Sequence, residues 1–295
     1  MRKYNAVFLL AAVWSGYYTA VKLINERMDS FAAGFAVRLI VFVMFTLILL
    51  WRGRLKEILL IRGIWKTLLL IGGFGFLLDI TAFLGFRFSQ SSATGTVLLK
   101  TDIFMVSILS VLMRKEKLKG TNWLLIFGLL AGTVMVMGFS PRDLRIEPGN
   151  LLFLLSALCI SVNALLIQHL QRKGAGNDTI AYYNNLIAML CFSAAALSGR
   201  GTGPDTIHWG WPLAAMLLAG GAGQLLIYLL YYKGLREHPA WVVKALLLLT
   251  PVFSLLTDAL VFKIVPGVTE AVGTAMIILC AFLLIYSRRE RGAVK

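Results

Sequence analysis

The sequence has 295 residues, of which 59% are hydrophobic and only 15% are charged, and its formal net charge is +15. A soluble domain is about half apolar and about a quarter charged, so a soluble fold of this length could not bury so much apolar surface. The basic residues stand in short segments between apolar stretches, which is typical of membrane loops and argues against nucleic acid as a partner. The composition therefore predicts an integral membrane protein whose outer surface contacts lipid.

Ten stretches of the chain have the character of membrane-spanning helices, each of which needs about 20 mostly apolar residues. The first stretch follows Arg2 and Lys3. No small-residue cleavage site comes after it, so we interpret it as an uncleaved span rather than a secretory signal. In chain order, the predicted spans cover residues 5–24, 33–51, 66–86, 91–113, 122–139, 149–170, 179–199, 211–233, 240–262 and 268–287.

The distribution of Lys and Arg predicts which side of the membrane each connecting segment faces. If the N-terminus is cytoplasmic, most of the 29 lysines and arginines fall in cytoplasmic segments, as expected from the positive-inside rule. An even number of spans then places the C-terminus on the same side. We therefore expect a multi-pass protein of the cell membrane with both termini in the cytoplasm.

Similar patterns in the two halves of the chain indicate an internal repeat. Residues 71–78 read IGGFGFLL and residues 219–226 read AGGAGQLL. Thr101 and Thr250 also take matching places in the fourth and ninth predicted spans. Several matches at nearly one offset, spaced like the spans themselves, favour duplication over chance.

The repeat has a geometric consequence for the predicted fold. The two copies are expected at residues 1–140 and 149–290, with a linker at 141–148 that contains two prolines. Because each copy has five spans, an odd number, the second copy must enter the membrane from the opposite side. The predicted fold is an all-α integral membrane protein with ten transmembrane helices in two inverted five-helix repeats, an architecture that recurs in secondary transporters.

Several segments match motifs of one family of membrane proteins. They are WSGYYTAVK, Arg38, GGFGFLL, FRFSQSSATG, RKEKLKG and GLLAG in the first half, and NDTIAYYNN, AGGAGQLL, YYKGLREHPAW and LLTPVFSLL in the second. With these motifs in this order, the chain resembles EamA-type members of the drug/metabolite transporter superfamily. It departs from the pattern at Asp102, where the second half has Pro251, and at Glu116, which has no counterpart. The resemblance implies ten spans and secondary transport of substrates from amino acids to sugars, purines and drugs, without a site signature common to the family.

Ionisable side chains inside predicted spans are candidates for a functional site, because such residues are costly in lipid and usually face a cavity or one another. Asp79 shares a helix face with Gly72 and Gly75, which would let another helix approach closely. We therefore expect Asp79 to point into the protein. It is either a substrate or proton site, or the structural partner of Arg38 or Lys100.

Two further charges lie near the centre of the fourth predicted span, at Lys100 and Asp102. On a continuous helix they would point to roughly opposite faces, so we expect each to need its own partner or water, and both are candidates for substrate binding or coupling. Arg38 either binds an anionic group or extends its side chain to the interface. Lys244 and Asp258 lie near the ends of the ninth span and rank lower, because each could reach the interface.

Polar and aromatic side chains at membrane depth could complete a pocket, although each could equally serve packing or a bond between helices. Pro251 lacks a backbone N–H, so it is expected to kink the ninth span and free carbonyl groups there. The polar and aromatic candidates are Trp14, Tyr17, Asn163, Asn184, Gln224 and Tyr228.

These features favour one function over its competitors. The sequence has no GxxxxGK[ST] phosphate loop and no metal-ligand spacing among its histidines and cysteines, so we expect no ATP-driven transport, no cofactor and no metal. We predict a secondary active transporter of a small polar metabolite, an amino acid or a related compound, that works by alternating access, with export favoured by the family resemblance. A multidrug efflux carrier of the same fold is the alternative. An intramembrane enzyme using Asp79 and Asp102, or a channel, is less favoured, and a monomer would suffice.

Overall fold

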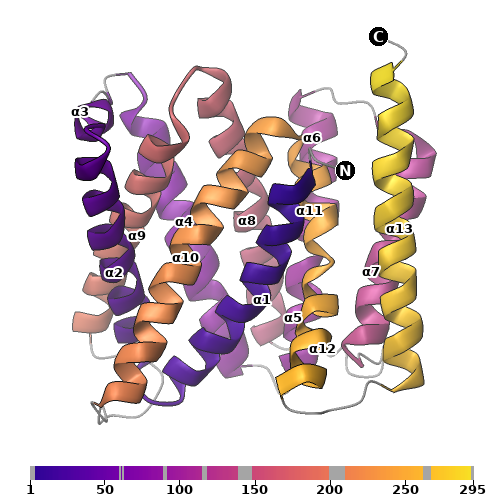
Figure 1. Ribbon diagram of the computed structural model, residues 1–295, viewed down its shortest axis with the longest axis horizontal. Helices are drawn as coiled ribbons and strands as arrows, with labels where there is room; N and C mark the ends of the chain where they lie inside the picture. Colours follow the sequence, from indigo (N-terminus) through magenta and orange to yellow (C-terminus); the bar gives the residue numbers. More distant parts are fainter. Residues whose placement is uncertain are drawn as a thin grey trace.

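The computed structural model describes residues 4–59, 61, 63–88, 92–114, 118–138, 148–198, 210–261 and 267–293. Within these ranges the chain is helical and contains no β-strand. Figure 1 shows the helices side by side in one bundle, with α1 beginning and α13 ending toward the same end of it. The helical segments are α1 (Asn5–Asn25), α2 (Ser30–Trp51), α3 (Leu55–Ile58), α4 (Trp65–Phe88), α5 (Ser92–Lys100), α6 (Asp102–Arg114), α7 (Gly120–Val136), α8 (Pro148–Arg172), α9 (Asn177–Leu197), α10 (Trp211–Glu237), α11 (Ala240–Leu247), α12 (Thr250–Val261) and α13 (Val268–Ala293).

Most predicted spans correspond to one helix each, with ends that agree to within several residues. Two predicted spans differ, because residues 91–113 are divided into α5 and α6, and residues 240–262 into α11 and α12. Most of the predicted linker lies outside the described residues, which resume at Pro148, the first residue of α8.

The two divided spans break beside the threonines that mark the sequence repeat. Thr101 Oγ1 donates a hydrogen bond of 2.6 Å to the carbonyl of Leu98, and Thr250 Oγ1 donates one of 2.7 Å to the carbonyl of Leu247. A side-chain hydroxyl that bonds a nearby carbonyl competes with the regular backbone bonds of a helix. The sequence predicts a kink at Pro251. In the structure the helix breaks just before this proline, between α11 and α12, and Pro251 occupies the first turn of α12, where a missing N–H is tolerated.

Helices of one half pack mainly on helices of the other half. The most extensive contacts join α4 with α8, α7 with α13, and α1 with α10, and α2 and α4 both pack on α9. If each helix is exchanged for its counterpart in the other repeat, the contact of α1 with α10 becomes the contact of α8 with α4. The largest hydrophobic core cluster contains buried residues of both halves, so the two repeats form one folded unit.

Glycines allow some of these helices to approach one another closely. A Cβ atom added to Gly72 of α4 would lie 2.4 Å from the Cβ of Ile187 in α9. In the contact of α7 with α13, a Cβ on Gly132 would lie 2.8 Å from the backbone oxygen of Gly273, and a Cβ on Gly273 would lie 2.7 Å from the oxygen of Gly132. Both contacts are therefore closed to larger residues, as is typical of helix packing in membranes.

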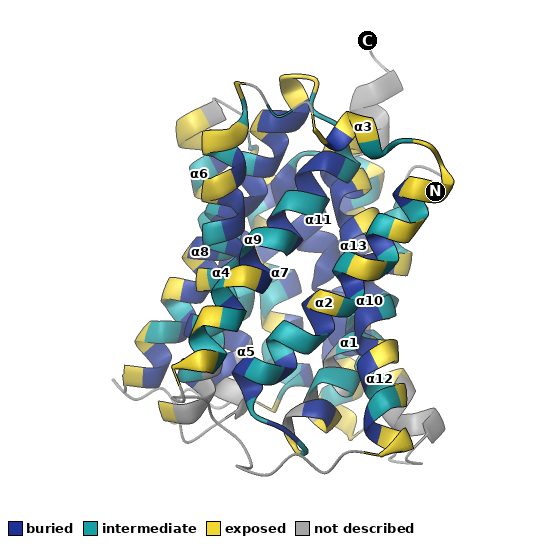
Figure 2. Cartoon of the chain, turned by 90° about the vertical axis from the view of Figure 1, so that its left-hand side faces the viewer, coloured by how far each residue is buried: buried dark blue, intermediate teal, exposed yellow. Residues whose placement is uncertain are grey.

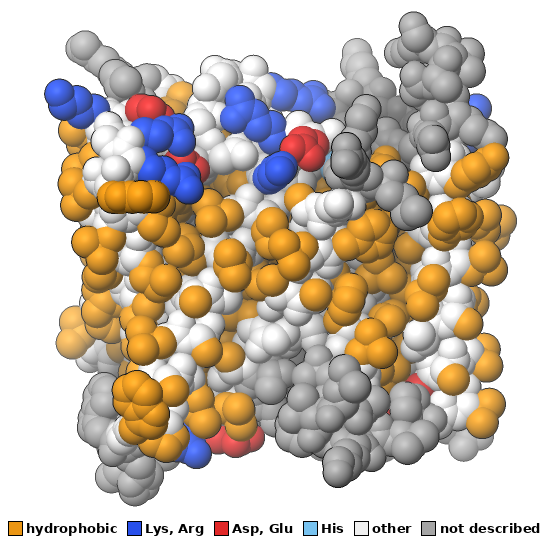
Figure 3. All heavy atoms as spheres, viewed as in Figure 1, with side chains coloured by type: hydrophobic (Ala, Val, Ile, Leu, Met, Phe, Trp, Pro, Cys, Tyr) orange, Lys and Arg blue, Asp and Glu red, His pale blue; other side chains and the backbone are white. Residues whose placement is uncertain are grey.

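The outer surface has the apolar belt of a membrane protein. Figure 3 shows hydrophobic side chains across the middle of one face and charged side chains toward the two ends, with most of the blue Lys and Arg atoms at one end. Figure 2 shows buried residues on the helix sides that face one another and exposed ones on the outside. Large apolar side chains such as Leu47, Leu112 and Leu124 are 60%, 71% and 71% exposed. Lipid is the solvent that makes such exposure stable, so the chain is a multi-pass membrane protein.

The described helices differ in how fully they meet the requirements of a membrane span. Six of them are long and apolar enough to cross a bilayer, judged by length and composition: α2, α4, α8, α9, α10 and α13. Shorter apolar helical runs lie at Asn5–Tyr17, Gly120–Val136 and Ala240–Leu256. The predicted number of ten crossings therefore depends on the shorter and divided helices.

Candidate functional site

Arg38 forms the centre of a buried polar cluster between the two halves. It lies in α2, whose N-terminus is capped by Asp29, a side chain that accepts hydrogen bonds from the backbone amides of Phe31 and Ala32 at 3.0 and 2.9 Å. The Arg38 side chain is 9% exposed and forms a salt bridge with Asp79 of α4, whose side chain is 27% exposed. The charge is therefore held inside the bundle and does not extend to the interface.

The second half of the chain supplies the remaining partners of Arg38. Its Nη1 donates to the hydroxyl of Tyr228 in α10 at 2.7 Å, and its Cζ lies 5.3 Å from the ring centre of Phe192 in α9. Asn185 of α9 donates to the backbone carbonyl of Arg38 at 3.0 Å. A guanidinium supplies five N–H donors in a fixed plane, which allows one side chain to join several helices. The structure therefore brings the predicted residues Arg38, Asp79 and Tyr228 together.

A second buried ion pair joins the halves at Lys244 and Asp102. The distance between Lys244 Nζ and Asp102 Oδ2 is 2.9 Å, and the two side chains are 4% and 10% exposed. Lys244 Nζ also lies 5.2 Å from the ring centre of Tyr231 and 5.9 Å from that of Trp14. Asp102 thus has a partner of its own. The ammonium group of Lys244 also lies within cation–π distance of two aromatic rings.

The break between α5 and α6 determines how Lys100 lies relative to Asp102. The two residues end one helix and begin the next, so the geometry of a continuous helix does not apply to them. Lys100 interacts electrostatically with both Asp102 and Lys244. Ser161 of α8 donates to the backbone carbonyl of Asp102 at 3.1 Å, which fixes the break against the second repeat. The fourth and ninth predicted spans therefore meet at their breaks through charged residues.

The remaining polar candidates lie around the first cluster. Asn184 of α9 donates to the hydroxyl of Tyr232 at 2.7 Å, and a Cβ on Gly75 would lie 2.4 Å from the Asn184 Oδ1 atom. That Oδ1 atom is buried and has no hydrogen-bond partner among the described residues. Asn163 donates to the backbone carbonyl of Ile71 at 2.6 Å, so it bonds α8 to α4. Of the polar candidates, Asn184 is the one that keeps an unused buried acceptor.

Two other candidates lie on α1 and α10. Tyr17 packs against Gly223, where an added Cβ would lie 3.5 Å from the tyrosine Cδ2 atom. Gln224 is buried in α10, one turn before Tyr228. The side chain of Asp258, which ranked lower in the sequence, lies outside the described side chains.

Comparison with known proteins assigns the family. The model of the EamA-like transporter family matches residues 2–138 and, a second time, residues 147–286. The chain belongs to the EamA-like transporter family. This assignment confirms the resemblance seen in the sequence and makes the protein a membrane transporter of two-repeat architecture within the drug/metabolite transporter superfamily. Members of this family are transporters and not enzymes.

One solved crystal structure illustrates the fold of this EamA-like transporter. Its TM-score is 0.83, and the match covers 98% of this chain and 99% of the other, with 18% sequence identity. At this identity the likeness establishes the fold alone. Among curated proteins, none matches the chain.

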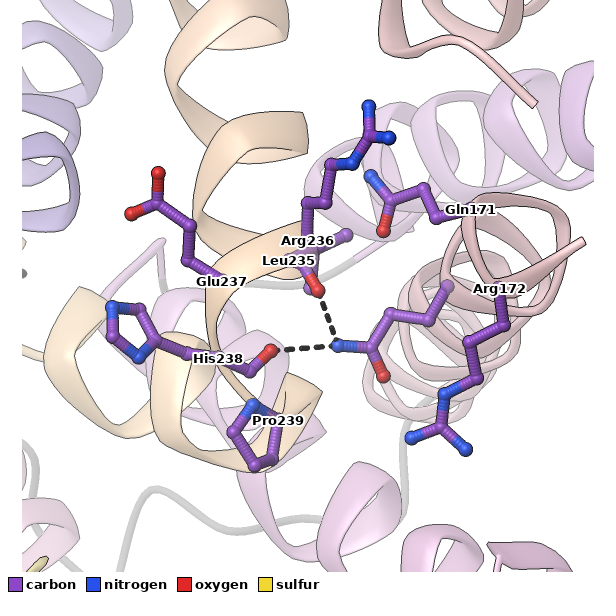
Figure 4. A pocket seen from close by; sticks show the side chains of 8 residues that line it. Gln171, Arg172, Leu235, Arg236, Glu237, His238 and Pro239 are labelled. Atoms are coloured by element: carbon purple, nitrogen blue, oxygen red, sulfur yellow. Dashed lines mark hydrogen bonds between the residues drawn. The ribbon is translucent and has the colours of Figure 1, made fainter. Parts of the chain in front are cut away.

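A polar cavity of about 260 Å³ lies at one end of the transporter, apart from the two buried ion pairs. Figure 4 shows its lining, where Gln168 of α8 donates to the carbonyls of Leu235 and His238 at 2.7 and 2.8 Å. These bonds attach the end of α8 to the turn between α10 and α11. The sequence predictions did not include this cavity, which is lined by Gln168, Gln171, Arg172, Leu235, Arg236, Glu237, His238 and Pro239.

A surface ion pair also joins the halves at the end of the bundle. Arg54, which precedes α3, bonds Asp178 of α9 at 2.9 Å and Glu57 at 2.7 Å. The hydrogen bond from Arg54, together with its charge, holds the pKa of the exposed Glu57 carboxyl below its usual value. The described residues hold no group of three or more His, Cys, Asp and Glu side chains that could bind a metal.

Sequence reasoning underestimated Lys244 and did not include Tyr231 or Phe192. Lys244 was placed near a helix end, where a long side chain reaches the interface, but α11 is buried along its whole length. The available signal was the run AWVVKALLLL, in which one lysine stands among apolar residues without a second charge. A single lysine in such a run requires a buried partner unless it reaches water.

Proposed function

We propose that the protein is a secondary carrier that moves a small polar metabolite, an amino acid or a related compound, across the cell membrane by alternating access. The observation that carries this proposal is a set of buried contacts of charged residues between the repeats. Arg38 contacts Asp79 in its own half and Tyr228 in the other, and Lys244 of the second half contacts Asp102 of the first. The contacts of Arg38 with Tyr228 and of Lys244 with Asp102 therefore lie where two rocking halves would separate.

The two divided helices support a binding site beside the Lys244–Asp102 ion pair. Secondary carriers commonly place their sites beside discontinuous helices, whose ends present unpaired backbone groups. Here the two breaks occur at matching positions of the repeats, and Lys100 and Asp102 flank one of them. A polar substrate that bonds these charges could replace the contacts between the halves, which is what alternating access requires.

The proposed topology counts each divided helix as one crossing, which gives five crossings per repeat and ten in all. The second repeat is then inverted relative to the first. The gathering of Lys and Arg at one end of the bundle supports placing that end, and with it both termini, in the cytoplasm. Labelling of single cysteines from either side tests this arrangement. Residues 53–65 and 201–207 should react from opposite faces, and reaction from the same face would refute the inversion.

Transport assays with purified protein in proteoliposomes test the function itself. Uptake and counterflow of a labelled amino-acid and metabolite panel should exceed the flux of empty vesicles, and Asp79→Asn should abolish the excess. Gly73→Ala is a matched control on the same helix, because an added Cβ there would meet nothing within 4 Å. Flux of lipophilic drugs alone would favour the multidrug alternative, and the absence of all flux would refute the carrier proposal.

A further inference from the structure

The two ends of the bundle are packed differently, although each helix has a counterpart in the other repeat. We call the end where α1 begins and α13 ends the terminal end, and Figure 1 shows α6 and α11 toward it and α5 and α12 toward the opposite end. In the terminal half α6 packs on α11, and the last turns of α8 are bonded to the turn between α10 and α11. The counterpart contacts would join α12 with α5, and α1 with α4 and α5. Among the described residues, none of these three helix pairs packs extensively, so the terminal end is the more closed one.

The burial of matching residues shows the same difference. When the repeats are aligned on the threonines beside the two breaks, Val106 and Ser107 of α6 correspond to Leu255 and Leu256 of α12. Val106 and Ser107 are both 0% exposed. Leu255 is partly exposed, and Leu256 is 52% exposed. The span that begins at Asp102 is therefore enclosed by protein, whereas the matching part of α12 is not.

The contact of α6 with α11 contains an ion pair that the opposite end cannot form. Lys244 of α11 bonds Asp102 of α6 at 2.9 Å, and both side chains are nearly inaccessible. In the alignment of the repeats, Asp102 corresponds to Pro251 and Lys244 to Gly95, neither of which carries a charge. A contact between α5 and α12 would therefore lack this pair. The ion pair stabilises a closed terminal end and has no equivalent that would close the other end.

Three tyrosines of α10 extend the closed region from the ion pair to Arg38. Tyr228 accepts a hydrogen bond from Arg38, and the ring of Tyr231 lies beside the ammonium group of Lys244. The ring of Tyr232 contacts both, with centre distances of 5.8 Å to Tyr228 and 6.1 Å to Tyr231. These tyrosines are 6%, 8% and 1% exposed in chain order. They therefore form a sealed aromatic layer between the two charged contacts.

We propose that the Lys244–Asp102 ion pair is the gate that closes the terminal end, and that this structure holds the conformation open toward the opposite end. The Asp79 side chain, which is 27% exposed, fits an opening of this kind. The proposal rests on the carrier function and specifies how access to its site is controlled. When the pair opens, α6 separates from α11, and the counterpart contact of α5 with α12 closes the opposite end.

Cysteine labelling tests the gate without a substrate. Val106 lies one turn after Asp102 on the same face of α6, so Val106→Cys reports on the contact with α11. It is introduced into a variant whose native cysteines, Cys159, Cys191 and Cys280, are replaced by alanine, and the protein in lipid nanodiscs is treated with a hydrophilic thiol reagent. Val106→Cys should react slowly, because the position is 0% exposed. Asp102→Asn should raise its rate by about tenfold or more, because Lys244 then loses the carboxylate that favours the closed end.

Two matched variants separate a gate from a general structural role. Asp102→Glu keeps the carboxylate, so it should keep the slow reaction of Val106→Cys. Ala188 of α9 is also 0% exposed and lies outside the contact of α6 with α11. Ala188→Cys should therefore stay unreactive when Asp102→Asn is present. A rise at Ala188→Cys as large as that at Val106→Cys would show that the whole bundle loosens, and would overturn the gate.

The remaining outcomes separate the gate from the carrier function. Equal rates for Val106→Cys with and without Asp102→Asn would overturn the gate, and so would a fast reaction in the protein with Asp102 intact, because the terminal end would then be open. Flux in proteoliposomes together with either result would leave the carrier function standing. A gate that opens with Asp102→Asn in a protein that moves no compound would instead support the gate and count against transport.

Discussion

The Arg38–Asp79 contact allows a quantitative test by a double-mutant cycle with Arg38→Met, Asp79→Leu and the double variant. Arg38 is nearly inaccessible and bonds both Asp79 and Tyr228, so Asp79→Leu leaves a buried cation that bonds the Tyr228 phenol but has lost its carboxylate. Breaking a buried pair on one side costs about 3–5 kcal/mol, because the remaining charge loses its partner. Arg38→Met should cost nearer the lower limit, since the Asp79 side chain is 27% exposed and can regain some hydration.

The double variant should lose much less stability than the sum of the single variants. With both charges removed, neither group is left without a partner, and apolar residues of similar size often replace a buried pair at little cost. The single losses together amount to about 6–8 kcal/mol, so a double variant that costs about 1 kcal/mol gives a coupling of roughly 5–7 kcal/mol. That is well above the roughly 0.3–0.5 kcal/mol within which independent sites usually add. The cycle is measured by unfolding the purified protein in detergent micelles with increasing SDS. Losses that simply add would show that Arg38 and Asp79 do not act as a pair.

Three other tests use contacts away from the buried charges. Gly72→Ala should be less stable than Gly73→Ala by roughly 1–3 kcal/mol in the same unfolding assay, because both gain the same helix propensity but only the first overlaps a side chain of α9. Arg54→Gln should lower the free energy of unfolding by under about 1 kcal/mol, since its pairs with Asp178 and Glu57 are partly exposed. The pKa of Glu57 is lowered in the folded state from the usual carboxyl pKa of 4.5. The stability that the Arg54–Glu57 pair contributes is therefore fully present above pH 4.5 and is lost as the pH falls through the lowered pKa. The difference in melting temperature between the unaltered protein and Arg54→Gln should thus be constant from about pH 8 to pH 5 and shrink only below that range, and a steady decline across neutral pH would contradict this assignment.

The sequence predicts the features of this fold that depend on local composition. Apolar stretches of sufficient length locate most of the helices, because lipid requires each crossing to satisfy its own backbone. The matching glycine patterns around Gly72 and Gly220 reveal the duplication, although the individual contacts have diverged. A Cβ on Gly221 would lie 2.4 Å from Ile40, whereas one on its counterpart Gly73 would meet nothing within 4 Å. A charged residue within an apolar run can also be recognised from the sequence, which is why Arg38, Asp79 and Asp102 were named as candidate site residues.

Apart from Arg38 as one of the alternative partners of Asp79, tertiary contacts could not be predicted in the same way. The contact of Arg38 with Tyr228 spans most of the chain, and neither residue shows in its local sequence which helix it will face. Lys244 was ranked low because hydropathy gives its position along a span but not whether its side chain can reach water. The break at Thr101 was missed because threonine bonds a carbonyl in many continuous helices, and only its surroundings decide whether the helix stops.

The contact between α7 and α13 has a consequence for how the molecule can move. Gly132 and Gly273 place each backbone against the carbonyl oxygen of the other, and the side chains of Ile277 and Met135 pack beside this contact. Sliding one of these helices past the other would break this main-chain contact. Because α7 and α13 end the two repeats, we expect a reorientation of the halves to keep the contact of Gly132 with Gly273 near its pivot.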